Sequence, residues 1–266
     1  MLVQAKKSIR HVLRTCAPTL LSSYIRRNWD LEAEIALLPA LCDRNRVSFD
    51  VGANWGQYTG ALPHISAGVI ACEPVPELAA FLRRAFRGIV RVEQVALSNR
   101  RGTAKLIIGP EWGESSLHNA DTVASRGVVV PVDTLDCLAA SPVGFIKVDV
   151  EGHEEEVIEG ALQVIARDRP VLILEIEERH RPGGLSRMLA RLGALGYEAF
   201  FLHDDAVHDV AAFSLARHQD PAHVYPASEG GAVKPGECYI NNFIFIHHSD
   251  ISERESRLAD LGYPMK

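Results

Sequence analysis

From residue 47 onward, short runs of apolar and β-branched residues alternate along the chain with amphipathic, helix-like segments. This alternation is typical of repeated βα units that build a mostly parallel sheet. The apolar runs predict seven strands, at residues 47–51, 69–73, 90–95, 145–150, 171–176, 198–202 and 239–247. The pattern therefore predicts an α/β fold with a mostly parallel seven-stranded sheet and helices on both faces.

Two segments have the clearest helical pattern. Residues 154–167 carry an apolar stripe that includes Val157 and Ile158, and three glutamates lead the first turn, where they favour the helix dipole. Residues 185–195 predict a second helix, which ends at Gly196.

The pattern changes between the third and fourth predicted strands. Apolar residues at 105–108 and 128–132 predict strands of an antiparallel excursion, separated by the polar stretch 109–125. A second polar stretch covers residues 204–238. Connections of this length inside a compact domain are usually lids, binding loops or mobile segments.

The length of 266 residues suits one main domain with short additions at its ends. We expect an N-terminal helical extension at residues 1–44, the α/β domain at 45–250 and a C-terminal tail at 251–266. The apolar fraction of 47% and the charged fraction of 23% are ordinary for a folded globular protein. Composition therefore predicts neither disorder nor a fibrous architecture.

The net charge of −6 provides no field that would attract nucleic acid, so we expect no nucleic-acid partner. The apolar stretches within residues 1–25 are too short for a membrane span or a signal peptide. A basic helix at residues 6–13 that touches a membrane surface is an alternative to one packed on the domain. The five cysteines have no paired spacing, which predicts a reducing, cytoplasmic setting.

The segment 50–56, with the sequence DVGANWG, follows the first predicted strand and opens a helix. Gly52 and Gly56 would let the backbone approach a nucleoside-bearing ligand, and Asp50 can accept a hydrogen bond from it. Three residues separate each pair of successive glycines at 52, 56 and 60, unlike the G-x-G-x-x-G pattern of dinucleotide folds. The spacing therefore disfavours a nicotinamide cofactor, although an ordinary βα turn with an aspartate cap would look similar.

A second acid, Glu73, closes the second predicted strand, 23 residues after Asp50. A carboxylate at this place can accept hydrogen bonds from both hydroxyls of a ribose. Both acids lie at the carboxyl ends of neighbouring strands, where open α/β sheets bind ligands.

Further acids follow the fourth and fifth predicted strands. Asp149 and Glu151 come at or just after one strand end, and His153 follows them as either a general base or a structural histidine. Glu175 ends the next apolar strand, and its burial would need a partner such as Lys147, a metal or a ligand.

These motifs occur together with three others in one order along the chain. The full set is DVGANWG at 50–56, CEP at 72–74, SSL at 115–117, VDTLD at 132–136, IKVDVEGHE at 146–154, LEI at 174–176 and NNFIF at 241–245. Together they resemble the FkbM-type methyltransferases over roughly residues 45–247. DVGAN alone indicates only the broad class of S-adenosylmethionine enzymes, whereas DVEG-x-E after a TLD stretch is more specific.

The resemblance implies a class I, Rossmann-like methyltransferase fold with S-adenosylmethionine as cofactor. It also implies O-methylation of a small-molecule or glycan acceptor, namely a sugar, glycolipid, polysaccharide or polyketide. Carried over by motif, the methionine end would be lined by Asp50, Gly52, Asn54 and Gly56, and the ribose by Glu73. Ser115 and Ser116 match a serine-rich turn near the cofactor pocket, or else form a surface turn. Substrate choice is expected in residues 1–44 and 204–238, which match no motif.

An alcohol must lose its proton as it attacks the methyl group, either to a base or with the help of a divalent cation. Our hypothesis is that Asp149 and Glu151 orient the acceptor and that His153 is the base. Asp149, Glu151 and Glu175 could instead supply oxygen ligands to Mg²⁺. The alternatives are methyl transfer to nitrogen of a small metabolite or peptide, a Rossmann-like oxidoreductase, and a binding module without catalysis.

Overall fold

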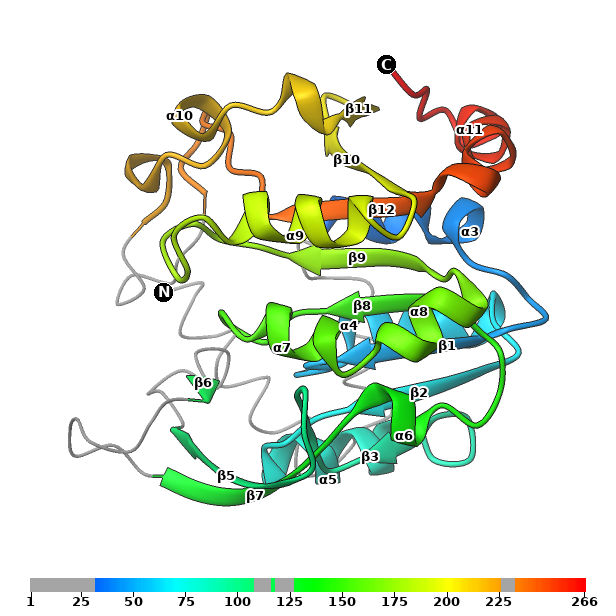
Figure 1. Ribbon diagram of the computed structural model, residues 1–266, viewed down its shortest axis with the longest axis vertical. Coiled ribbons are helices and arrows are strands. Elements are labelled where there is room, and N and C mark those ends of the chain that lie inside the picture. The colour runs from blue at the N-terminus through cyan, green and yellow to red at the C-terminus, as the bar shows by residue number, and fades with distance from the viewer. Residues whose placement is uncertain (1–31, 108–115, 118–126, 226–232) are drawn as a thin grey trace, which may run out of the picture.

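The computed structural model describes residues 32–107, 116–117, 127–225 and 233–266 (Figure 1). Most of the predicted N-terminal extension lies outside the described residues. So do Ser115 and nearly all of the polar stretch 109–125.

Within the described residues, the main sheet has eight strands in the order β11-β10-β12-β9-β8-β1-β2-β3. Pairs β1–β2, β1–β8, β2–β3 and β8–β9 are parallel, whereas β12 is antiparallel to both β9 and β10. The bounds are β1 Val47–Val51, β2 Gly68–Cys72, β3 Arg91–Glu93, β8 Val143–Val148, β9 Val171–Glu175, β10 Tyr197–His203, β11 Ala206–Asp209 and β12 Asn242–His247. All seven predicted strands are present. The eighth, β11, is formed by the start of the stretch predicted as a loop, which folds back antiparallel onto β10.

The antiparallel excursion forms a second sheet of its own, with four strands in the described part of the chain. Strand β5 is antiparallel to β6 and β7, and β4 is parallel to β7. The bounds are β4 Ala96–Leu97, β5 Gly102–Ile107, β6 Ser116–Leu117 and β7 Gly127–Asp133. This sheet packs through Leu106, Val130 and Val132 against Val75 and Leu78, beside the end of β2.

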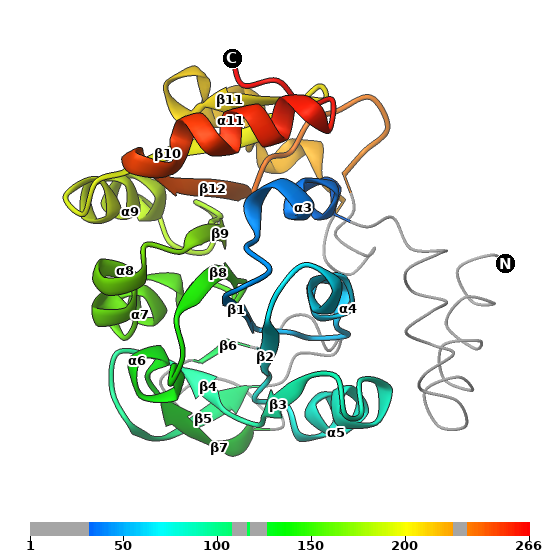
Figure 2. The ribbon, with the colours of Figure 1, turned by 90° about the vertical axis from the view of Figure 1, so that its right-hand side faces the viewer.

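Helices cover both faces of the main sheet, as Figure 2 shows. One face carries α6 (Leu135–Leu138), α7 (Glu154–Glu159), α8 (Leu162–Asp168) and α9 (Gly184–Gly193). The other carries α3 (Leu38–Leu41), α4 (Gln57–Ala61), α5 (Pro76–Ala85) and α11 (Ile251–Asp260). The remaining helical segments are η1 Ala33–Leu37, η2 Leu62–His64, η3 Val210–Ala212, α10 Leu215–His218, η4 Pro221–His223 and η6 His248–Asp250. Two large apolar clusters fill the space between the sheet and these helices.

The helix predicted at 154–167 is two helices, so the prediction of one continuous helix was wrong. Helix α7 ends at Glu159 and α8 begins at Leu162. A Cβ at Gly160 would lie only 2.0 Å from the carbonyl oxygen of Ser98. The backbone that follows β4 therefore packs against Gly160. The apolar stripe in the sequence does not reveal this tertiary contact.

Helix α11, within the segment predicted as a tail, packs against α3. Arg254 donates a hydrogen bond to the carbonyl oxygen of Ala40, and Arg257 donates to those of Pro39 and Cys42. These carbonyls end α3, so the two arginines satisfy acceptors that lack a partner within that helix. In the part of the chain that the structure describes, no helix is long and apolar enough to cross a membrane. The expected domain boundaries remain predictions.

Candidate active site

Two adjoining cavities lie where the carboxyl ends of β1, β2 and β8 meet at one edge of the main sheet. The first encloses about 710 Å³, including the space at its mouth, and the second about 390 Å³. Gly52, Asn54 and Asp149 line both cavities. Sizes of this order suit a small molecule or cofactor. The pair of cavities lies at the edge predicted from the strand-end acids.

The loop between β1 and α4 has a conformation that needs its glycines. Gly52 has φ +80° and Gly56 has φ +82°, a region that residues with a side chain adopt at a cost. A Cβ at Gly52 would lie 1.7 Å from the carbonyl oxygen of Asp149. The backbone N–H groups of Gly52 and Ala53 both donate to the carbonyl oxygen of Cys72, which fixes the loop onto β2. The loop therefore presents backbone, rather than side chains, at this end of the site.

Glu73 is held in the first cavity by this same loop. Its two carboxyl oxygens accept hydrogen bonds of 2.8 Å from the N–H groups of Asn54 and Val75. Burial raises the pKa of Glu73 to about 7, although the two backbone hydrogen bonds act against that rise. The carboxyl group thus has a fixed orientation and still lines the cavity.

Asp50 lies inside β1 and lines the second cavity rather than the first. The hydroxyl of Thr59, in α4, donates a short hydrogen bond to its carboxylate. Burial raises the pKa of Asp50 to about 6. The structure therefore separates the two acids, with Glu73 at the first cavity and Asp50 at the second.

Two buried amide oxygens at the second cavity have no hydrogen-bond partner among the described residues. They are Oδ1 of Asn54, a residue with φ +47°, and Oε1 of Gln57. Buried acceptors in folded proteins are nearly always satisfied, so two of them at one cavity indicate a ligand with N–H donors. Gln57 was not among the sequence-predicted site residues.

A buried ammonium group adjoins the second cavity. Lys147, in β8, places Nζ 2.5 Å from Oδ1 of Asn242, 3.5 Å from Oε2 of Glu32 and 3.9 Å from Oε2 of Glu175. Burial alone would lower its pKa, but the carboxylates of Glu32, Asp149 and Glu175 raise it above the usual value. Lys147 thus supplies the positive charge that these acids need in the interior.

The carboxylates of Glu32, Asp149 and Glu175 offer ligand atoms that all lie within 4.8 Å of one another. The sequence predicted Asp149, Glu151 and Glu175 as the set that could hold a cation. Glu32, from outside the predicted domain, takes the place of Glu151 in the observed cluster. Burial raises the pKa of both Asp149 and Glu175.

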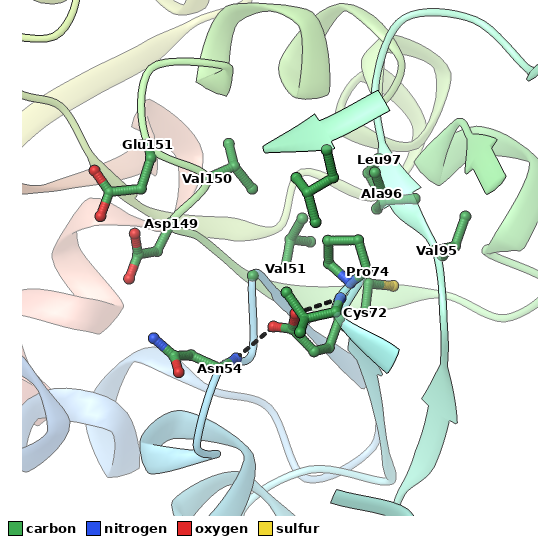
Figure 3. A pocket seen from close by; sticks show the side chains of 14 residues that line it. Val51, Asn54, Cys72, Pro74, Val95, Ala96, Leu97, Asp149, Val150 and Glu151 are labelled. Atoms are coloured by element: carbon green, nitrogen blue, oxygen red, sulfur yellow. Dashed lines mark hydrogen bonds between the residues drawn. The ribbon is translucent and has the colours of Figure 1, made fainter. Parts of the chain in front are cut away.

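Glu151 lines the first cavity beside Asp149 (Figure 3) and contacts His180. Its Oε2 lies 3.2 Å from Nδ1 of His180, in the loop after β9. Burial first, and then the charges of Asp149, Glu177 and Glu154, raise the pKa of Glu151 to about 8. His180 was not predicted as a site residue.

The other predicted residues lie farther from the two cavities. His153 begins α7, with Nε2 3.0 Å from Oγ of Ser98 and Nδ1 3.4 Å from Oε2 of Glu156. Neither cavity, as the described residues form them, is lined by His153. Ser116 pairs with Ile107 in the second sheet, and Ser115 lies outside the described residues.

Sequence reasoning missed Glu32, Gln57, Tyr58 and His180. Tyr58 donates a hydrogen bond of 2.9 Å to Oε2 of Glu32, and Asn242 donates one of 3.0 Å to the same oxygen. Gln57 and Tyr58 lie in α4 and His180 lies in a loop, and the pattern of apolar and polar residues in these segments did not single them out. Lys147 did carry a signal, because a lysine inside an apolar strand needs a buried partner.

Comparisons with known proteins identify the family of the chain. A family model described as "Methyltransferase FkbM domain" matches residues 50–199, more than half of the chain. No curated protein sequence matches the chain. Among solved structures, the FkbM methyltransferase from Methylobacillus flagellatus is similar over 88% of this chain, with a TM-score of 0.50 and 14% identity. This chain spans 60% of the length of that protein.

Two further structures show weaker likenesses, and neither bears on the assignment. The rRNA methylase from Streptococcus thermophilus has a TM-score of 0.43 and 9% identity, and the match covers 84% of this chain and 99% of that one. A putative methyltransferase from Streptococcus mutans, in complex with S-adenosylhomocysteine, has a TM-score of 0.45 and 9% identity, over 82% and 98%. The family model, which spans the β1 loop, Glu73 and the acids after β8, decides the assignment. The chain belongs to the FkbM methyltransferase family.

Proposed function

We propose that this protein transfers a methyl group from S-adenosylmethionine to a hydroxyl oxygen of a sugar, glycolipid, polysaccharide or polyketide-type acceptor. The observation that carries the proposal is the pair of cavities joined at Gly52, with Glu73 at one and two unpartnered amide oxygens at the other. The methyl donor has a nucleoside at one end and an amino acid, with an ammonium and a carboxylate group, at the other. The two cavities offer hydrogen-bond acceptors for the ribose hydroxyls and for the ammonium group.

The first cavity suits the nucleoside end. Glu73 can accept hydrogen bonds from ribose hydroxyls, and Val95, Ala96 and Leu97 offer an apolar surface for a base. The second cavity suits an ammonium group, since Oδ1 of Asn54 and Oε1 of Gln57 lack donors and Asp50 lies beside them. These residues would hold the cofactor that membership of the FkbM family implies.

The bound cofactor supplies a methyl group on a sulfonium sulfur. The protein has to align the acceptor oxygen, exclude water and accept a proton from the hydroxyl. Asp149 and Glu151 both line the first cavity directly after β8, so they can orient a hydroxyl there. The presence of carboxylates that can accept a hydroxyl proton at this cavity supports oxygen, rather than nitrogen, as the methylated atom.

A divalent cation at Glu32, Asp149 and Glu175 would be an alternative way to acidify the hydroxyl. The ammonium group of Lys147 already lies next to these carboxylates and balances part of their charge. We therefore propose that catalysis proceeds without a metal. Activity that is lost on chelation and restored by Mg²⁺ would contradict this part of the proposal.

The proposed function is tested by methyl transfer from cofactor labelled in its methyl group. The acceptors are methyl glycosides of common hexoses and deoxyhexoses, together with amines of similar size such as glucosamine. We expect an O-methyl product from at least one glycoside. Label that appears only on the nitrogen of the amines would replace the proposal with N-methylation, and no labelled product from any acceptor would contradict it for these classes.

A further inference from the structure

We propose that Glu151 and His180 form a proton-transfer pair, in which Glu151 takes the proton of the acceptor hydroxyl and His180 passes it to solvent. The inference rests on the proposed O-methylation and adds a residue that neither the motifs nor the family model assigns. Glu151 is the catalytic member, and His180 is a positioning residue that acts through it.

The turn after β8 places Glu151 at the cavity. Glu151 has φ +53° and Gly152 has φ +90°, so two successive residues adopt the left-handed conformation. For a residue with a side chain, this conformation costs about 1 to 2 kcal/mol. Strain of this kind is typical of residues whose position is set by function. Here it turns the carboxyl group of Glu151 into the first cavity, beside Asp149.

The loop after β9 holds His180 against Glu151. The N–H of His180 donates to the carbonyl oxygen of Glu177 at 3.0 Å, which closes a tight turn. The carboxylate of Glu177 is itself held by Arg179 and by the hydroxyl of Tyr239, at 2.6 Å from the latter. A Cβ at Gly152 would come within 3.5 Å of the Cβ of His180, so the two turns are in contact.

Of the two residues, Glu151 lines the first cavity and His180 does not. Oε2 of Glu151 lies 3.2 Å from Nδ1 of His180. Both side chains reach solvent, since Glu151 is 29% exposed and His180 is 30% exposed. A proton accepted at Glu151 therefore has a route through the imidazole to water.

Burial and the surrounding charges make Glu151 more basic and His180 less basic than usual. Asp149, Glu177 and Glu154 raise the pKa of Glu151 beyond the effect of burial, and Arg179 lowers it. Burial lowers the pKa of His180, the charge of Glu177 raises it and that of Arg179 lowers it. A carboxylate made more basic by its surroundings is a better acceptor for a hydroxyl proton than an ordinary surface carboxylate.

The acceptor O–H bond breaks with its proton moving to Glu151, and the oxygen lone pair forms the bond to the methyl carbon. The bond between that carbon and the sulfonium sulfur breaks, and its electron pair stays on sulfur. The proton then leaves Glu151 through His180, which restores the carboxylate for the next turnover.

His153 makes a similar contact with a carboxylate but does not meet the cavity. Both of its ring nitrogens are engaged, by Ser98 and by Glu156. We therefore assign the proton path to His180 in place of the base expected from the motif.

The test compares His180→Ala and Glu151→Gln with wild type, in the full chain, using labelled cofactor and the glycoside that the wild type methylates. We expect kcat to fall about 100-fold in each variant, with the affinity for S-adenosylhomocysteine unchanged. Added imidazole should restore part of the activity of His180→Ala, which a merely structural role would not allow. The matched control is His223→Ala, because His223 pairs with Glu237 at the same 3.2 Å, apart from both cavities. This variant should keep its activity and should not respond to imidazole.

A second measurement tests the pair without any acceptor. In nitrogen NMR spectra of the protein bound to S-adenosylhomocysteine, Glu151→Gln should shift the Nδ1 signal of His180, as Glu237→Gln should shift the signal of His223. An unmoved His180 signal, or a His180→Ala variant as active as wild type, would overturn the inference. Absence of transfer to any acceptor by wild type would instead contradict the proposed function, and the NMR result would still decide whether the pair exists.

Discussion

Gly52 occupies a position in the candidate site that has no room for a side chain. A side chain there would meet the Asp149 carbonyl oxygen at 1.7 Å, and the backbone has φ +80°. We predict that Gly52→Ala lowers the free energy of unfolding by about 3 kcal/mol, from backbone strain plus steric overlap, and abolishes cofactor binding.

Gly88→Ala is the matched control for this prediction, since Gly88 has φ +74° and no atom of the described chain within 4 Å of its added Cβ. It should cost about 1 kcal/mol and leave binding intact. Chemical denaturation and calorimetry measure both effects. Equal losses in the two variants would show that the close approach at Gly52 has no energetic consequence.

Glu73 gives the site a pH dependence with a definite sign. Folding raises its pKa from 4.5 to about 7, so the stability it confers on the free protein is present below pH 4.5 and is lost as the pH rises through 7. Cofactor binding should respond in the opposite direction, because the ionised carboxylate is the form that accepts two ribose hydrogen bonds. We predict that affinity for S-adenosylhomocysteine increases as the pH rises through about 7. Glu73→Gln should remove this rise, and a wild-type affinity that falls over this range would oppose the ribose assignment.

At the scale of elements, the break between α7 and α8 depends on Gly160. Alanine is favoured over glycine in helices by about 1 kcal/mol. A Cβ at Gly160 would nevertheless lie 2.0 Å from the Ser98 carbonyl oxygen, and such overlap costs about 1 to 3 kcal/mol. We predict that Gly160→Ala is destabilising in thermal unfolding.

Gly193→Ala, in α9, provides the comparison because no atom of the described residues lies near its added Cβ. This substitution should stabilise the protein by about 0.5 to 1 kcal/mol. If Gly160→Ala were stabilising as well, the two helices would be one helix in solution.

Elements were predictable from sequence wherever local pattern determines structure. The β-branched runs predicted seven strands, and all seven are present. The turn after β1 was located from Gly52 and Gly56, whose positive φ angles favour glycine. The apolar stripe across 154–167 shows which face of a helix is buried, but it does not show where another segment packs against the helix. Ser98 packs against Gly160, and the single predicted helix is interrupted there. Strand β11 was missed because its few residues lie in a polar stretch.

At the scale of the whole molecule, Lys147 joins segments from both ends of the chain. Its ammonium group lies between Glu32, near the start of the described residues, and Asn242 in β12. Replacing it with methionine would leave Glu32, Asp149 and Glu175 buried together without their cation. We predict that Lys147→Met lowers the free energy of unfolding by about 3 to 5 kcal/mol in urea denaturation.

Lys105→Met serves as the control, since Lys105 is exposed on β5 and should change stability by less than about 0.5 kcal/mol. A Lys147→Met variant as stable as this control would mean that the acids are neutral in the folded protein.

The same long-range contacts explain which site residues the sequence could predict. Glu73 and Asp149 follow strands directly and Asp50 lies near the end of β1, so strand prediction alone brings them to one edge. Glu32 and His180 reach the site only through the packing of distant loops, and no spacing in the sequence records that. Glu32 lies beside Lys147 and His180 lies beside Glu151, so both of these predicted residues have partners that the sequence did not indicate.

Binding of S-adenosylmethionine in the two adjoining cavities is tested by calorimetric titration of the full chain with S-adenosylhomocysteine. We expect saturable binding at a single site, about tenfold or more weaker in Glu73→Gln because one carboxylate's hydrogen bonds to the ribose are lost. NADH should not compete. Undetectable binding to wild type, or equal affinity in wild type and Glu73→Gln, would show that these cavities do not bind the cofactor through Glu73.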